Sequence, residues 1–310
     1  MASERVLVTP LDVDENIYLI DVMMFGEPNF GGVYFIDDER RTIVETGTSH
    51  DYPRILSALK QLNVEPSSVQ NVIVTHIHLD HAGGAGYLLD YLENAKVYVH
   101  ERGFPHLARP ERLLESASRA LGEAFKDYGT LKPMPETRMV ALRGGEVLDL
   151  GGRELEFIYT PGHARHHLCV LDRSTRSLFA GDAAGIYFPE DERLIPTTPF
   201  PEFDLPRAIE TMRTVARLNP KALLYTHFGP RQDAQKALRN QQAEYERWGR
   251  QSKELLDAGD LGEAVRTVYE GWYADVGGFP RPFVERVIET NLRGFQKFFQ
   301  RTREHASGTR

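Results

Sequence analysis

The sequence lacks several features that would assign it to a specialised class of protein. Its single cysteine, Cys169, excludes an internal disulfide. It contains no apolar run long enough to span a bilayer, no low-complexity tract and no internal repeat. We therefore expect a soluble globular chain with no membrane partner, and 310 residues are enough to bury a sizeable core.

Basic charge is also scarce. Lys and Arg number 37 against 45 Asp and Glu, which gives a net charge of -8 and an isoelectric point near 5.8. Because affinity for nucleic acid comes largely from clustered Lys and Arg, this balance argues against a nucleic-acid partner. The opening MASERVLVTPLDVDEN carries acidic residues where a secretory signal needs an apolar run. Together with the lone cysteine, this favours the cytoplasm.

The first half of the chain alternates between two periodicities. Apolar runs at 17–25, 32–37 and 41–45 predict strands, and the spacing within 51–63 predicts a helix. VQNVIVTH then reads as a buried strand, GGAGYLLDYLENA as one helix and KVYVH as another strand. This order of strands and helices predicts an α/β layered domain.

Two further regions depart from that rhythm. Residues 101–139 read as a helical insertion, which either forms a wall over a site or extends the scaffold. Strand patterns resume at 140, and beyond residue 230 only helical periods follow. We therefore predict a catalytic domain over 1–230 and a helical region over 231–310 that packs on it.

The densest polar run is THIHLDHAGG, which begins at Thr75 directly after an apolar strand. Its ligand-type side chains are His76, His78, Asp80 and His81. They would gather at the carboxyl end of a strand, where sites in open α/β sheets tend to lie. A polar loop that happens to contain histidines is the alternative, and four ligand types in so short a stretch make a metal site the better interpretation.

Three later motifs repeat this placement. His163 lies in TPGH, Asp182 in AGD and His227 in THFG, each just beyond an apolar strand. Taken alone, such an Asp is more often a turn residue and such a His more often structural. Their recurrence indicates that all three lie at the same edge of the sheet as the first cluster.

This ordered set resembles the metallo-β-lactamase superfamily of binuclear metallohydrolases. The resemblance covers about residues 10 to 230 and implies a four-layer αβ/βα sandwich, here with a C-terminal helical extension. It also implies that His76, His78 and His163 bind a first metal ion, that Asp80, His81 and His227 bind a second, and that Asp182 bridges them. Glu45, in VETGTS, replaces the aspartate that usually precedes Thr-Gly in the family, and we expect it to support the ligands rather than bind metal.

The ligand types set the expected chemistry. Imidazole and carboxylate ligands suit Zn²⁺ best here and also Fe or Mn, and two such ions can lower the pKa of a water molecule toward about 7. Besides ligating, Asp80 could orient the nucleophile and carry its proton, so Asp80 and Asp182 are the predicted catalytic residues. The best-known β-lactamases have a cysteine where Asp182 stands, so antibiotic hydrolysis is disfavoured.

Four other residues are candidates for supporting or substrate-binding roles: Glu45, His167, Tyr187 and Tyr225. His167 could hydrogen-bond near the site, whereas its neighbour His166 is expected to be exposed. Either tyrosine could supply a hydroxyl to the substrate, although packing is the more common role of such a residue. Specificity would come from loops at 25–32, 101–139 and 185–203.

The favoured function is a hydrolase that uses two metal ions to cleave a carboxylic ester, a thioester or a lactone in a small molecule. The alternatives are a phosphodiesterase acting on small phosphodiesters and a diiron protein that binds or reduces O₂ on the same fold. Diiron relatives typically carry Glu where His78 stands and act with a flavin domain, and neither feature is present here. The sequence allows a homo-oligomer and does not identify the substrate.

Overall fold

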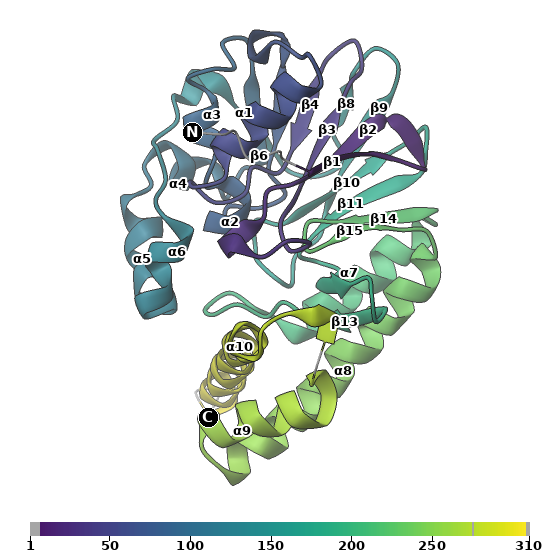
Figure 1. The fold of residues 1–310 in the computed structure, drawn as a ribbon. Coiled ribbons are helices and arrows are strands. Elements are labelled where there is room, and N and C mark those ends of the chain that lie inside the picture. The colour runs from purple at the N-terminus through teal and green to yellow at the C-terminus, as the bar shows by residue number, and fades with distance from the viewer. Residues whose placement is uncertain (1–6, 275, 308–310) are drawn as a thin grey trace. The chain divides into compact units, whose positions relative to one another are not determined.

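The computed structural model describes residues 7–274 and 276–307 (Figure 1). The chain divides into two compact units, each built from several segments. Unit 1 comprises the chain as far as residue 159 together with 166–181 and 220–233, and unit 2 comprises 160–165, 182–219 and the chain from 234 onward. The chain therefore passes between the units several times, whereas the sequence suggested one boundary near residue 230.

The first sheet of unit 1 has seven strands in chain order: β1 (Leu7–Leu11), β2 (Asp14–Asp21), β3 (Gly32–Ile36), β4 (Thr42–Val44), β5 (Asn71–Ile73), β6 (Lys96–His100) and β7 (Met139–Leu142). Pairing is antiparallel from β1 to β4 and parallel from β4 to β7. Each parallel pair needs a crossover connection, which explains why all helices of this unit follow β4.

These crossovers are helical. α1 (Tyr52–Gln61) joins β4 to β5, and α2 (Leu79–Ala82) and α3 (Ala85–Leu88) join β5 to β6. The predicted insertion between β6 and β7 contains α4 (Phe104–Ala108), α5 (Glu111–Leu121) and α6 (Phe125–Tyr128). Short 3₁₀ turns lie at Met24–Gly26, Pro66–Ser68, Gly122–Ala124 and Glu136–Arg138.

The second sheet of unit 1 has the order β15-β14-β11-β10-β9-β8. Its strands are β8 (Val147–Asp149), β9 (Glu154–Tyr159), β10 (Leu168–Asp172), β11 (Ser177–Gly181), β14 (Ala222–Tyr225) and β15 (Gly229–Arg231). Buried side chains from both sheets, among them Ile17 and Tyr34 from the first and Phe157 and Leu224 from the second, form one apolar core. The sheets therefore face each other across that core, and the predicted α/β sandwich with a C-terminal helical extension is confirmed.

Unit 2 is a helical unit with one hairpin. The hairpin pairs β12 (Ile186–Phe188) with β13 (Arg193–Ile195), and the helices are α7 (Leu205–Arg217), α8 (Ala234–Ala258), α9 (Leu261–Val268) and α10 (Arg281–Ser307), with a π-helical turn at Tyr269–Tyr273 and a 3₁₀ turn at Val276–Gly278. Trp248 and Phe295 are fully buried, and their rings stack 6.2 Å apart. The aromatic residues of α8 and α10 thus form a core. Within the described part of the chain, no helix has the length and low charge needed to cross a bilayer.

Two local predictions differ from the structure. The segment GGAGYLLDYLENA, residues 83–95, was expected to form one helix, but its only helical part is the single turn α3, which follows Gly83 and Gly84. A Cβ on Gly84 would lie 2.4 Å from the carbonyl oxygen of Thr46, so this turn packs directly on the backbone after β4. The β12–β13 hairpin lies in 185–203, which was expected to be a loop. Each of its strands has only three residues, too few to show a clear strand pattern in the sequence.

Candidate metal centre

The segment after β5 holds four of the predicted ligands. β5 ends at Ile73, and His76 follows in irregular backbone and is fully buried. His78 occupies the N-cap position of α2 in extended conformation, so the chain turns there and places Asp80 and His81 in the single turn of α2. Gly83 ends that turn because a Cβ at this position would approach the backbone of Thr48 and Ser49 to less than 3 Å.

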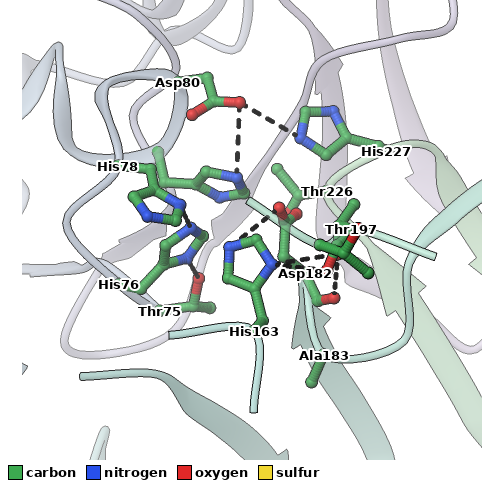
Figure 2. A network of polar contacts seen from close by, with 12 residues as sticks. Thr75, His76, His78, Asp80, His163, Asp182, Ala183, Thr197, Thr226 and His227 are labelled. Atoms are coloured by element: carbon green, nitrogen blue, oxygen red, sulfur yellow. Dashed lines mark hydrogen bonds and ion pairs between the residues drawn. The ribbon is translucent and has the colours of Figure 1, made fainter. Parts of the chain in front are cut away.

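His76 and His78 bring two ring nitrogens together. Nε2 of His76 lies 2.8 Å from Nδ1 of His78, and the two rings are nearly perpendicular (Figure 2). Nδ1 of His76 lies 3.0 Å from Oγ1 of Thr75, which donates its own hydrogen to Glu45 at 2.5 Å. Nδ1 of His76 therefore carries the ring hydrogen, and Nε2 keeps its lone pair. At 2.8 Å, either Nδ1 of His78 donates a hydrogen to Nε2 of His76 or both nitrogens face a cation.

Asp80, His81 and His227 form a second group in unit 1. One donor atom from each lies within 4.8 Å of the other two. Oδ2 of Asp80 is 3.9 Å from Nε2 of His81 and 3.7 Å from Nε2 of His227 (Figure 2). His227 comes into place because it follows β14, which pairs with β11 in the interior of the second sheet. The structure thus brings together three side chains that the sequence separates by nearly half the chain.

The opposite nitrogens of these two rings contact groups that accept hydrogen bonds. Nδ1 of His81 lies 3.3 Å from Oε1 of Glu45, and Nδ1 of His227 lies 2.8 Å from the carbonyl oxygen of Phe30. A carbonyl can only accept, so Nδ1 of His227 carries hydrogen and its Nε2 presents a lone pair toward Asp80, and the nearby carboxylate of Glu45 favours the same tautomer in His81. This is the tautomer that a metal-binding histidine needs.

Unit 2 holds the remaining two predicted ligands. His163 lies in the segment 160–165, and Asp182 directly follows β11. Nε2 of His163 is 3.4 Å from Oδ2 of Asp182, and Nδ1 is 3.1 Å from both the carbonyl oxygen and Oγ1 of Thr197 (Figure 2). Because Oγ1 of Thr197 donates to the carbonyl oxygen of Asp182 at 2.7 Å, it can only accept from His163. His163 therefore also presents a lone pair on Nε2.

The supporting candidates lie in different surroundings. Glu45 is buried beside His81 and Thr75, and its backbone φ of 69° is rare for a residue other than glycine. His167 is fully buried, with its ring centroid 5.1 Å from that of His76. Tyr187 and Tyr225 are buried in β12 and β14, and the Tyr225 carbonyl accepts a hydrogen bond of 2.6 Å from Tyr34.

The expectation that His166 is exposed was wrong. It is buried, and its ring centroid lies 5.7 Å from that of His78. The segment GHARHH turns inward because the strand β10, which it enters, is buried along its whole length. Sequence reasoning assigned the inward position to His167 alone.

Sequence reasoning also missed the groups that fix the ring tautomers. These are the Thr75 hydroxyl, the Phe30 carbonyl and the Thr197 backbone and hydroxyl. Of these only Thr75 had a usable signal, since it directly precedes the first ligand. Phe30 and Thr197 lie in loops far along the chain from their histidines, so no local pattern indicates them.

Electrostatics beneath the site favour a neutral tyrosine. Burial raises the pKa of Tyr34 well above its usual value, and the nearby Glu45 carboxylate raises it further. Tyr34 therefore stays protonated and donates to the Tyr225 carbonyl two residues before His227. This bond ties β3 to the strand that carries His227.

The donor set fits a transition metal. Imidazole nitrogens and carboxylate oxygens are the ligands of Zn, Fe and Mn, and the histidine tautomers in both units present the nitrogen that a metal would take. In unit 1, Asp80, His81 and His227 would hold one ion, and His76 and His78 supply two donors for another. The residues that the structure describes therefore support metal binding, independently of which metal is bound.

Comparison with known proteins finds relatives of similar sequence and fold. The metallo-beta-lactamase fold-containing protein ST1585 of Sulfurisphaera tokodaii is 32% identical over 276 residues, which cover 87% of this chain and 92% of that protein. Its crystal structure superposes with a TM-score of 0.66 over 91% of this chain and 98% of the other.

Two relatives with named activities are more distant. The human acyl-coenzyme A thioesterase MBLAC2 is 30% identical over 54% of this chain and 63% of its own length. The hydroxyacylglutathione hydrolase of Francisella tularensis is 27% identical over 48% of this chain and 45% of its own length. Residues 26–227 match the family model of the metallo-beta-lactamase superfamily. This match spans well over half of the chain, and the protein therefore belongs to that superfamily.

Proposed function

We propose that this protein is a binuclear metal-dependent hydrolase that cleaves a carboxylic ester, a thioester or a lactone in a small-molecule substrate. The observation that carries the proposal is the common tautomer of His76, His81, His163 and His227. In His76, His163 and His227, Nδ1 has a protein acceptor within hydrogen-bond distance, and in His81 it faces Glu45 at 3.3 Å, so Nε2 is the ring nitrogen that each would offer to a metal. A set of histidines that served only packing would have no reason to share this arrangement.

We propose the ligand assignment that the family resemblance implies. His76, His78 and His163 would bind the first ion, Asp80, His81 and His227 the second, and Asp182 both. Zn²⁺ is the ion that the ligand types favour, with Fe or Mn as alternatives. When bound, such a pair of ions supplies an activated water and polarises the carbonyl of the substrate.

The chain's own carboxylates then have distinct roles. Asp182 is held at its carbonyl by Thr197 and lies beside Nε2 of His163, so its carboxylate is fixed in place as a ligand. Asp80 is partly exposed and lies between two histidines, so its second oxygen can orient a nucleophile and accept its proton. Proton transfer to the leaving group would follow from the same carboxyl.

An acyl substrate is favoured over a phosphodiester on two grounds. Two relatives with named activities are an acyl-coenzyme A thioesterase and a hydroxyacylglutathione hydrolase, both of which act on acyl thioesters. The net charge of -8 also disfavours nucleic acid, the largest class of phosphodiester, as the substrate. We propose a thioester as the first substrate class to test.

The test is a hydrolysis panel of esters, acyl thioesters, lactones and phosphodiesters with the protein loaded with Zn²⁺, Mn²⁺ or Fe²⁺. The expected result is turnover of at least one acyl class, lost at least 100-fold in His76→Ala and in Asp182→Ala, as expected when a catalytic metal is removed. His305→Ala, at an exposed position near the end of α10 and outside the ligand set, is the matched control and should keep full activity. Two bound ions with turnover of phosphodiesters alone, or of nothing, would contradict the proposal.

A further inference from the structure

The dipeptide Thr197–Thr198 lies between the predicted ligands of unit 2 and the C-terminal helix α10. It follows β13 closely, and both residues are buried. One residue faces the ligands and the other faces the helix, as the contacts below show. The inference drawn from this placement rests on the proposed function.

Thr197 contacts both ligands of this unit. Its carbonyl oxygen and Oγ1 lie 3.1 Å from Nδ1 of His163, and its hydroxyl donates to the carbonyl oxygen of Asp182 at 2.7 Å (Figure 2). One residue thus sets the tautomer of His163 and the backbone position of Asp182. A shift of Thr197 would displace both.

Thr198 is held by α10. Its backbone N–H donates to Oδ1 of Asn291 at 2.7 Å, and its hydroxyl donates to the Asn291 carbonyl at 2.9 Å. Asn291 is itself buried. Its side chain satisfies a backbone donor that has no strand partner at this point in the chain.

Gly294 brings the helix into direct contact with this dipeptide. A Cβ at Gly294 would lie only 1.5 Å from the carbonyl oxygen of Thr198, so no larger residue fits. The backbone of α10 therefore packs directly on the backbone of Thr198. Such close approach leaves the dipeptide little freedom to move relative to the helix.

α8 adds a second attachment to the same loop. The hydroxyl of Tyr245 donates to the carbonyl oxygen of Ala183 at 3.2 Å, one residue after Asp182. Gly185 also donates to the Asp182 carbonyl at 3.1 Å. The backbone around Asp182 is therefore held by the helical tail as well as by Thr197.

We propose that α10 is a positioning element of the metal centre, acting through Asn291 and Gly294 on Thr198 and through Thr197 on His163 and Asp182. The C-terminal helical region then does more than cover a core, because it controls metal affinity. Metal binding is tight only when its ligands are held in place before the ion arrives, and groups that orient ligands typically change affinity by about 10- to 100-fold.

The experiment measures Zn²⁺ affinity by competition with a chromophoric chelator, on full-length protein shown to be folded by circular dichroism. Asn291→Ala and Thr197→Val should weaken the binding of the more weakly held ion by about 10-fold or more. Thr197→Ser, which keeps the hydroxyl, should restore binding to near the wild-type value. Val284→Ala, a buried position of α10 away from the dipeptide, should lower the melting temperature without changing affinity.

The outcomes separate this inference from the function on which it rests. Wild-type protein that binds no metal contradicts the proposed function. Wild-type protein that binds metal, with Asn291→Ala and Thr197→Val indistinguishable from it, contradicts the positioning role alone. An equal loss of affinity in Val284→Ala would also contradict it, because general destabilisation would then explain the effect. If Asn291→Ala fails to fold, the comparison of Thr197→Val with Thr197→Ser decides.

Discussion

At the scale of single residues, the site is defined by which ring nitrogen of each histidine carries the hydrogen. The groups that face Nδ1 are chemically different: a hydroxyl beside His76, a carboxylate beside His81, and a carbonyl beside His227. All favour the same tautomer, in which Nδ1 carries the hydrogen and Nε2 takes the ligand role. Glu45 is the one such group that is charged, which makes it the most informative to change.

Glu45→Gln should therefore weaken metal binding. The change keeps the shape of the side chain but removes the charge that holds Nδ1 of His81, so we expect affinity for one ion to fall by about 10- to 100-fold. The measurement is the metal content per chain after dialysis against a buffered concentration of free Zn²⁺. Glu65→Gln, at an exposed position, is the control. Full metal content in Glu45→Gln would show that His81 needs no such partner.

Arg153 holds together part of unit 1 away from the metal site. Its guanidinium is nearly buried and contacts Asp14, Asp38 and Asp172 at 2.8 to 2.9 Å. Burial alone would raise the pKa of Asp38, but the hydrogen bond from Arg153, together with backbone N–H groups and the charge of Arg153, outweighs it and lowers that pKa. A carboxyl with a lowered pKa stabilises the fold above its unfolded pKa, about 3.9, and this contribution is lost as the pH falls through the folded value.

Arg153→Met should therefore destabilise the protein in a pH-dependent way. Removing the cation from buried carboxylates is expected to cost about 3 kcal/mol at pH 7. The deficit should shrink as the pH falls from about 4 through the lowered pKa of Asp38, because that carboxyl is then protonated in both the folded and the unfolded state. Urea unfolding at several pH values tests this. Arg173→Met, which removes an exposed partner of Glu154 and Glu156, should leave the urea midpoint unchanged. A deficit that does not depend on pH would refute the explanation.

At the scale of elements, the sequence predicted where strands end better than how loops close. The runs before His76, Asp182 and His227 are all strands that end within a few residues of the predicted ligand. Apolar, β-branched runs directly indicate buried strands, which explains why these strand ends could be predicted. The β12–β13 hairpin and the Thr197 contacts were missed because they depend on packing between segments far apart in the chain.

The Gly83–Gly84 turn shows how one element depends on another. Thr46 donates both its backbone N–H and its hydroxyl to the His81 carbonyl, and this is possible because Gly84 has no Cβ to push Thr46 away. The helical pattern of the sequence does not reveal this contact, because both glycines can lie within a helix despite their low helix propensity.

Gly84→Ala should therefore disturb the loop that carries Glu45. We expect a loss of about 1 to 3 kcal/mol in the free energy of unfolding, as for other substitutions that overfill a packed site, together with weaker metal binding. Thermal and urea unfolding of the apoprotein measure the first effect. Gly271→Ala, where a Cβ would meet open space, is the matched control and should be close to wild type. Equal behaviour of the two variants would show that the turn can relax.

At the scale of the whole molecule, the predicted ligands are shared between the two units. Unit 1 supplies five of them and unit 2 supplies His163 and Asp182. The sequence predicted the α/β sandwich, and it allowed seven ligands to be proposed, because strand ends and ligand types are local features. It did not predict that the chain passes repeatedly between the units, since that depends on contacts distant in sequence. The substrate depends on loop shape for the same reason.

The proposed function predicts that hydrolysis requires two bound metal ions. The most direct measurement removes metal with a chelator and follows hydrolysis of an acyl thioester, or of the best substrate from the panel, as Zn²⁺ is added back in measured steps. The account predicts that the apoprotein is folded but inactive and that activity rises to a plateau at two ions per chain, with Asp182→Ala inactive throughout. Hydrolysis that survives complete removal of metal, or that is unchanged in Asp182→Ala, would contradict it.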